Sequence, residues 1–325
     1  MHIRPELAAL RSNDAPQRSA QQALADIAHA WRLTGDGATV EAELVRFHRG
    51  ERLERLPLLG ALFAPQSDRV RAFLDGLLQP LLAQIGLEPL GQSPLRYSTS
   101  DAATGIVLAR CATSALILHY TSGPGFSRQP AAQTAGFLPA ETWERVLAGS
   151  AEATRVRLAG TASDRADLRL AAVRLQAGDV RHRHGRDEAL VLRAVPTSLV
   201  QLRLQRRSDE AQPVRHYRLS DGQLVHQAAG TPRDSRLELS AALLGRMKRR
   251  DAAPVLAAMV KESGSDALRW QILRECLALD TATGFRALCS ICDRAADPLN
   301  QHAATLRATL LARHPSLKDL MPCPA

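Results

Sequence analysis

Apolar residues recur at helical spacing through the first quarter of the chain. Between residues 17 and 88 they return every three or four positions, and the broadest stripe runs from Val70 to Ile85. This spacing places apolar side chains on one face of each helix, which predicts a helical region over residues 17–88. Residues 1–16 lack the periodicity and contain Pro5 and Pro16, so we expect them to form a flexible arm.

Residues 89–232 change to a period of two, which predicts an antiparallel β domain. Leu202 and Leu204 alternate with polar neighbours, as residues on opposite faces of one strand do. A Ser-Asp-Gly turn signal at residues 220–222 separates two segments of strand composition. Short strands at spacings of about 8–12 residues are typical of a β sandwich or barrel.

Two segments interrupt this alternation. Residues 122–139 contain three glycines and three prolines, and we expect them to form a long surface loop. The segment that follows, Pro139–Leu147, is expected to be one short helix.

Helical periodicity returns over residues 233–318, where a series of five helices with short links is predicted. Paired helices of this length resemble HEAT-type repeats, and the resemblance implies a helical array. The whole pattern predicts an α+β fold. It has an N-terminal helical region, a central antiparallel β sandwich or barrel and a C-terminal array of HEAT-like hairpins.

The composition is that of an ordinary folded protein with a strongly basic charge. The net charge is +9, and only three of the 42 basic residues are lysines. The arginines are spread along the chain, and aromatic residues make up only 4%, so platforms for stacking nucleic-acid bases are few. Nucleic-acid binding therefore stays a third interpretation, behind binding to an unidentified protein partner.

The sequence contains no signal for a membrane or for export. Charged residues interrupt the apolar stretches every few positions, so no membrane-spanning segment is expected. The first twenty residues lack the continuous apolar run of a secretory signal. The five cysteines are odd in number and do not suggest a disulfide framework. We therefore expect a cytoplasmic protein.

One short segment, residues 178–188, carries side chains that suit a metal site. His182 and His184 alternate, so both would point to one side of an extended strand, and Glu188 lies at an even offset from them. Two imidazoles and one carboxylate suit iron, manganese, nickel or zinc, with positions left open for a substrate. His226, on a later strand, is the candidate fourth ligand. The alternative is a polar hairpin in which Glu188 pairs with an arginine on the next strand and no cofactor is bound.

This pattern of His182, His184 and Glu188 resembles the first half of the cupin metal motif. The resemblance implies a small β barrel that holds a metal ion between these side chains. It also implies a metal-dependent dioxygenase or isomerase activity. The second half of the motif is absent from the sequence.

No complete catalytic motif is present in the sequence, which favours a non-catalytic function. Neither a nucleophile elbow nor a zinc-protease, dinucleotide-binding or EF-hand motif occurs. We therefore expect a cytosolic binding or scaffold protein whose helices or β domain contact another macromolecule. Trp270 and Arg274 lie four residues apart on a predicted helix and are candidate partner-binding residues, since tryptophan and arginine often anchor interfaces. The cupin-like enzyme is the alternative.

Overall fold

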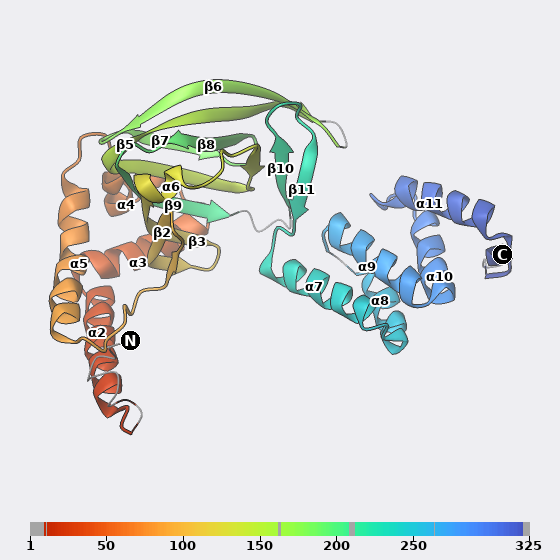
Figure 1. The fold of residues 1–325 in the computed structure, drawn as a ribbon, viewed down its shortest axis with the longest axis horizontal. Coiled ribbons are helices and arrows are strands. Elements are labelled where there is room, and N and C mark those ends of the chain that lie inside the picture. Colours follow the sequence, from red (N-terminus) through yellow and green to blue (C-terminus); the bar gives the residue numbers. More distant parts are fainter. Residues whose placement is uncertain (1–9, 11, 162–163, 208–211, 263, 321–325) are drawn as a thin grey trace. The chain divides into compact units, whose positions relative to one another are not determined.

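The computed structural model describes residues 10, 12–161, 164–207, 212–262 and 264–320. Helices and antiparallel strands occur in the predicted order, which confirms the α+β class (Figure 1). The chain divides into two units, one with residues up to 208 together with 217–223, and one with residues 209–216 together with those from 224 onward. None of the helices in the described part of the chain is long and apolar enough to cross a membrane.

The first unit begins with helices whose apolar faces converge on one core. They are α2 (Ala15–Leu33), α3 (Gly35–His48), the short η1 (Leu53–Arg55), α4 (Pro57–Leu62) and α5 (Arg69–Leu87). Pro57 lies in the first turn of α4, where its missing N–H has no helical partner to lose. The buried carboxylate of Glu43 accepts hydrogen bonds from the backbone N–H groups of Leu58 and Leu59, at 3.0 and 2.7 Å. Glu43 therefore caps α4 and ties it to α3.

An antiparallel sheet forms the rest of the first unit, and the long strand β5 (Ala140–Thr161) organises it. The strand order is β1-β2-β3-β9-β5-β6, and β7 and β8 also pair with β5. The first part of β5 pairs with β9 and β7, and its later part pairs with β6 and β8. The other strands are β1 (Tyr97–Thr99), β2 (Ala103–Cys111), β3 (Ser114–Ser122), β6 (Ala166–Gln176), β7 (Val180–His184), β8 (Glu188–Ala194) and β9 (Ser198–Arg207). This arrangement fits the predicted β sandwich.

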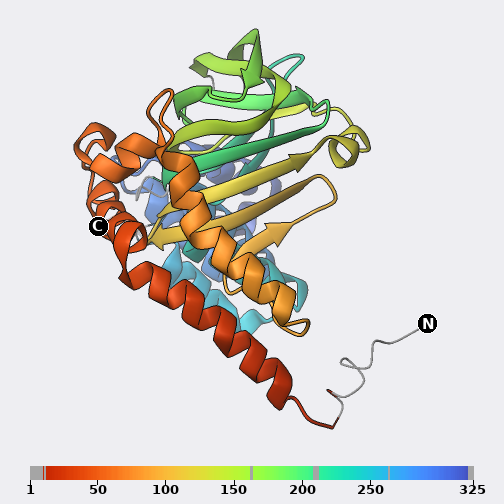
Figure 2. The same ribbon diagram turned by 90° about the vertical axis from the view of Figure 1, so that its left-hand side faces the viewer.

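The N-terminal helices cover one face of the part of the sheet that contains β2, β3, β9 and β5 (Figure 2). Leu116, Leu202 and Leu204 from the strands are fully buried. They belong to the same apolar cluster as Phe47 of α3 and Phe73 of α5. Burying such side chains contributes about 1.5–3 kcal/mol each, so this contact is a principal source of stability for the first unit.

Residues 122–139 contain more regular structure than the predicted long loop. They include the short helix α6 (Gly123–Ser127) and the strand β4 (Thr134–Phe137). The Ser122 side chain accepts a hydrogen bond from the N–H of Gly125, so the glycines and prolines here form a capped turn. Phe137 packs edge to face on Tyr217, with ring centroids 5.8 Å apart, and places β4 beside β10 (Val214–Arg218).

Pro139–Leu147 is not the expected short helix. From Ala140 onward this segment is the first part of β5. Trp143 pairs with His182 on β7 and with Leu204 on β9, so strands flank it on both sides. Backbone pairing on two edges outweighs a weak local preference for helix, which is why the local pattern was misleading.

The predicted turn at residues 220–222 is confirmed. It joins β10 to β11 (Leu224–Ala228), and Gly222 adopts a positive φ of 71°. A Cβ atom at this position would lie 1.9 Å from the carbonyl oxygen of Ala166. Glycine is therefore required here both for the turn and for the close approach of the two backbones.

The second unit ends in helices that share one apolar core. They are α7 (Pro232–Arg246), η2 (Arg250–Ala252), α8 (Ala253–Met259), α9 (Asp266–Leu279), α10 (Thr281–Cys292), α11 (Asn300–Arg313) and η3 (Pro315–Leu320). Ser265 and Asp280 cap α9 and α10 by accepting backbone hydrogen bonds. The HEAT-like array is not confirmed, because α9 packs against α7, α8 and α10 as the centre of a small bundle.

Candidate metal centre

The two histidines of the half-motif lie on β7, at the edge of the sheet beside β5. A tight turn at Gly178, whose φ is 94°, returns the chain from β6 to β7. The pairing of β7 with β5 places His184 opposite Glu141 and His182 opposite Trp143. Because side chains alternate along a strand, all four point to the same face of the sheet.

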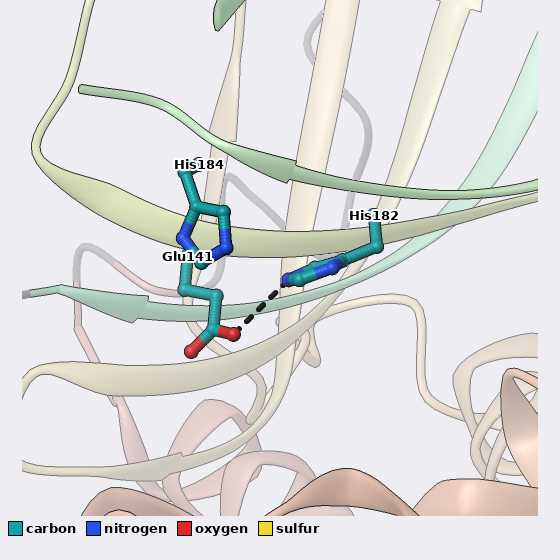
Figure 3. Close-up of side chains that lie close together, drawn as sticks. All are labelled: Glu141, His182 and His184. Atoms are coloured by element: carbon teal, nitrogen blue, oxygen red, sulfur yellow. Dashed lines mark hydrogen bonds and ion pairs between the residues drawn. The ribbon is translucent and has the colours of Figure 1, made fainter. Parts of the chain in front are cut away.

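Glu141, His182 and His184 form a group that could hold a metal ion (Figure 3). Each offers one ligand atom, and the three atoms lie within 4.8 Å of one another. The His182 Nε2 and Glu141 Oε1 atoms are 3.0 Å apart, and the two imidazole rings lie 4.9 Å apart at an angle of 70°. The His182 side chain is 40% exposed and that of Glu141 is 21% exposed. The group is therefore open to solvent on one side.

Aromatic and cationic neighbours hold this group in place. The Trp143 ring stacks on the His182 ring and also packs edge to face on Phe47 of α3. Arg206 of β9 forms an ion pair with Glu141 Oε2, donates a hydrogen bond to the backbone oxygen of Phe47 at 2.6 Å, and lies over the Phe47 ring. One carboxylate oxygen of Glu141 therefore faces the histidine and the other faces the arginine.

Glu188 does not join the two histidines. Gly185 and the two residues after it turn the chain, and Glu188 begins β8, where it pairs with Arg157 at 2.7 Å. The N–H of Gly185 donates to the Ala140 oxygen, and a Cβ atom on Gly185 would lie 2.3 Å from the Leu138 oxygen. The sequence prediction assumed that the chain stays extended from His182 to Glu188, and this turn ends the extended segment before Glu188. The hairpin alternative placed this arginine on the next strand, whereas Arg157 lies on β5, earlier in the chain.

His226 lies on β11, and its ring neighbour is His216, with centroids 5.6 Å apart. Burial and the nearby His226 lower the pKa of His216. Neither histidine is part of the metal-competent group found among the described residues. The fourth ligand therefore stays a prediction.

The two candidate partner-binding residues lie on α9 of the second unit. Trp270 is half-buried, packs against the apolar core of the helices, and lies 6.2 Å from the His302 ring. Arg274 is exposed one turn further along the helix. Trp270 thus packs on the core of the helices, and Arg274 is a charged residue on the surface.

Glu141 is the residue that the sequence did not reveal. It lies 41 positions before His182, in the segment expected to be a helix. A signal existed in hindsight, since Glu141 and Trp143 alternate as His182 and His184 do. Only the pairing of β5 with β7 makes that alternation meaningful.

No protein-family profile matches this chain, and no curated protein matches it. Among solved structures, a Lactobacillus farciminis oxalate decarboxylase matches with a TM-score of 0.26 and 14% identity, over 37% of this chain and 36% of that chain. A DMSP lyase from Ruegeria pomeroyi matches with a TM-score of 0.26 and 16% identity, over 46% and 66%. A cupin superfamily protein from Desulfitobacterium hafniense matches with a TM-score of 0.23 and 9% identity, over 34% and 83%.

These neighbours are cupin-fold proteins. With TM-scores of 0.26, 0.26 and 0.23, these likenesses carry no argument about this chain and transfer no activity. The chain spans about a third of the length of the oxalate decarboxylase, 36%.

The expectation of a non-catalytic binding or scaffold protein is corrected at this point. The finding that overturns it lies among the side chains, because the similar solved structures have TM-scores of only 0.26 or below and carry no argument. Glu141 completes a three-ligand group with His182 and His184, whereas the sequence offered only an incomplete one. The cupin-like enzyme alternative is therefore favoured. The side-chain group carries the proposal that follows, and the weak likeness of fold does not.

Proposed function

We propose that Glu141, His182 and His184 bind one divalent transition-metal ion and that the chain is a cupin-like, metal-dependent enzyme. The observation that supports this most directly is the convergence of three ligand atoms within 4.8 Å, contributed by two paired strands. Two imidazoles and one carboxylate suit iron, manganese, nickel or zinc, and they leave coordination positions open for a substrate.

The spacing of the ligand atoms fits such an ion. Two ligand atoms that each lie about 2.1 Å from a metal are themselves about 3.0–3.4 Å apart. The His182 Nε2 and Glu141 Oε1 atoms already meet this condition at 3.0 Å. His184 completes the group after a small side-chain rotation, which its exposed position permits.

The neighbours of the group suit the role of orienting its ligands. Arg206 takes the second oxygen of Glu141 and so directs the first toward the imidazoles. Trp143 covers one face of the His182 ring and limits its rotation. Partners of this kind tune metal affinity in known sites, where their loss typically costs about 10- to 100-fold.

A metal held here would supply Lewis-acid or redox chemistry to a small substrate at its open positions. The reaction classes that fit are oxidation by dioxygen and isomerisation. The residues of this chain would contribute the ligand geometry.

Metal content is the first test. Protein purified without chelator is analysed for bound metal, and apo protein is titrated with iron, manganese, nickel and zinc. We expect about one ion per chain, lost in Glu141→Gln and in the His182→Ala/His184→Ala double variant. Glu188→Gln serves as the control, because the Glu188 carboxylate pairs with Arg157. His226→Ala separately tests the predicted fourth ligand.

Two outcomes would overturn the ligand set. One is the absence of stoichiometric metal in wild-type protein after reconstitution. The other is an equal loss of metal in Glu188→Gln and Glu141→Gln, which would assign the carboxylate ligand to β8. The enzymatic part is tested with metal-loaded protein and a panel of oxidisable small molecules, followed by oxygen uptake and product analysis. Turnover that the double variant lacks is expected.

A further inference from the structure

The face of the sheet opposite the histidines carries a second cluster of charged residues. Along β7, Arg181 and Arg183 alternate with His182 and His184, so the arginines point to the other side. The strand pairing places Glu144 of β5 opposite Arg181 on β7 and opposite Arg203 on β9.

This second face is the interior side of the sandwich. Val146 follows Glu144 by two residues on β5, and Leu199 shares a face of β9 with Arg203. Both apolar residues are buried in one cluster with Val195, which directly follows β8, and with Leu175 of β6. The charged residues therefore lie beside an apolar core, where water is scarce and charges need partners.

The buried carboxylate of Glu144 forms ion pairs with two arginines in this cluster. The Glu144 side chain is 3% exposed, and its oxygens lie 3.3 Å from Arg183 Nε and 2.7 Å from Arg203 Nη2. Burial alone would raise the pKa of Glu144, but Arg203 and Arg183 together lower it to about 2. Glu144 is therefore ionised at neutral pH. Two cations and one anion leave one positive charge in excess.

Nothing else in the described residues neutralises that charge. Glu144 is the only described carboxylate within ion-pair distance of Arg183 or Arg203. In the same part of the chain, the Nε atoms of Arg203 and Arg181 are buried without a hydrogen-bond partner. Burial and the charge of Arg203 also lower the pKa of His119 on β3, which favours the neutral ring, so His119 does not offset the excess charge.

We propose that this interior face binds a small carboxylate anion through Arg203 and Arg183, with Arg181 at its margin. The planar guanidinium group matches a carboxylate with two parallel hydrogen bonds. The Arg183 and Arg203 side chains keep 17% and 26% exposure, so a small ligand can reach them from solvent. An excess of one charge favours a monocarboxylate over a doubly charged phosphate. The site stands apart from the proposed metal centre and does not depend on it.

The experiment compares anions at equal ionic strength. The Tm of the wild-type protein is followed in acetate, phosphate and chloride, because a ligand that binds only the folded state raises Tm with concentration. We expect acetate to raise Tm above the value in chloride, and Arg203→Gln to weaken acetate binding at least tenfold. His182→Ala/His184→Ala should keep the wild-type response. Arg157→Gln, which removes an arginine from the same unit, should keep it as well.

The wild-type measurement remains decisive even if Arg203→Gln fails to fold. Equal Tm values in acetate and chloride would overturn the proposal, and a larger rise with phosphate would overturn the choice of carboxylate. In ¹⁵N-labelled wild-type protein, acetate should also shift the Nε–Hε signal assigned to Arg203. Arg183→Gln provides the second variant. An undiminished acetate response in Arg183→Gln and in Arg203→Gln would equally overturn the assignment.

Discussion

The indole ring of Trp143 lies flat on the imidazole ring of His182, with centroids 4.2 Å apart and an angle of 17° between the planes. The other contact of Trp143, with Phe47 at 5.3 Å, links this stack to helix α3. The orientation of a candidate metal ligand on an edge strand is thus set by a helix more than 130 residues earlier in the chain.

This stack gives an optical signal for metal binding. Nickel or cobalt ions bound to His182 should quench Trp143 fluorescence, because the indole is in direct contact with the ligand ring. We expect quenching that saturates at one ion per chain. Trp143→Phe should keep the metal, since an aromatic ring still covers His182, but lose this quenching. If Trp143→Phe is quenched as strongly as the wild type, the signal comes from another tryptophan and the stack is not beside the ion.

Glu144 should make the stability of the first unit sensitive to acid. Its pKa is lowered from an ordinary value of about 4.3 to about 2, because Arg203 and Arg183 outweigh the effect of burial. A group with a lowered pKa stabilises the fold above its unfolded pKa, and this contribution is lost as pH falls through the folded value. We therefore expect about 3 kcal/mol of stability to disappear between about pH 4.5 and about pH 2.

Urea unfolding at a series of pH values checks this expectation. Glu144→Gln should be less stable at pH 7 by about 3 kcal/mol, because two partly buried arginines lose their common partner. It should also lose less stability across the acid range. Glu152→Gln, at an exposed position of the same strand, is the control. Parallel pH profiles for wild type and Glu144→Gln would contradict the assignment.

Arg145 of β5 holds the connection between α4 and α5 against the sheet. Its guanidinium group donates hydrogen bonds to the backbone oxygens of Leu62, Ala64 and Ser67, at 3.2, 2.8 and 2.8 Å. Arg145→Met would leave these carbonyls without their donor, and we expect a loss of about 2–4 kcal/mol in the free energy of unfolding. Denaturant titration measures it, with Arg110→Met at an exposed strand position as control. A loss similar to that of the control would mean that water replaces the arginine.

Gly149 and Gly178 provide a matched test of backbone fit. Both have positive φ angles, 77° and 94°. A Cβ atom on Gly149 would lie 1.8 Å from the Ser198 oxygen, whereas a Cβ atom on Gly178 would enter open space. Gly178→Ala should therefore cost about 1–2 kcal/mol for its backbone angle alone. Gly149→Ala should cost clearly more or prevent folding, and equal Tm values for the two variants would contradict this.

The sequence was most reliable where a pattern is local. Leu202 and Leu204 alternate with polar residues, and the structure buries both on one face of β9. The alternation could not say what covers the polar side, and Gln201 on that side is also buried, at 4% exposure. Alternation reports which residues share a face, because side chains point to opposite sides of a strand, but it does not report what lies against each face.

In the candidate site, too, local spacing predicted one feature and the strand pairing decided another. His182 and His184 lie two residues apart on a strand, so their side chains share one face of the sheet. The sequence alone determined this. Their carboxylate partner does not follow from spacing. Glu188 is nearer in sequence but begins another strand after a turn. Glu141 lies opposite His184 because of the register in which β5 pairs with β7. Register depends on backbone hydrogen bonds and on side chains far away in sequence, and a single short segment does not contain that information.

The sequence by itself therefore determined the α+β class, the order of helices and strands, the turn at residues 220–222 and the shared direction of two histidines. The tertiary structure decided that residues 140–147 are strand, that Glu141 joins the histidines and that Glu144 lies between two arginines. The reason is physical. Local patterns reflect preferences of a few tenths of a kcal/mol to about 1 kcal/mol per residue, whereas pairing on both edges of β5 and burial of its side chains add many such terms together.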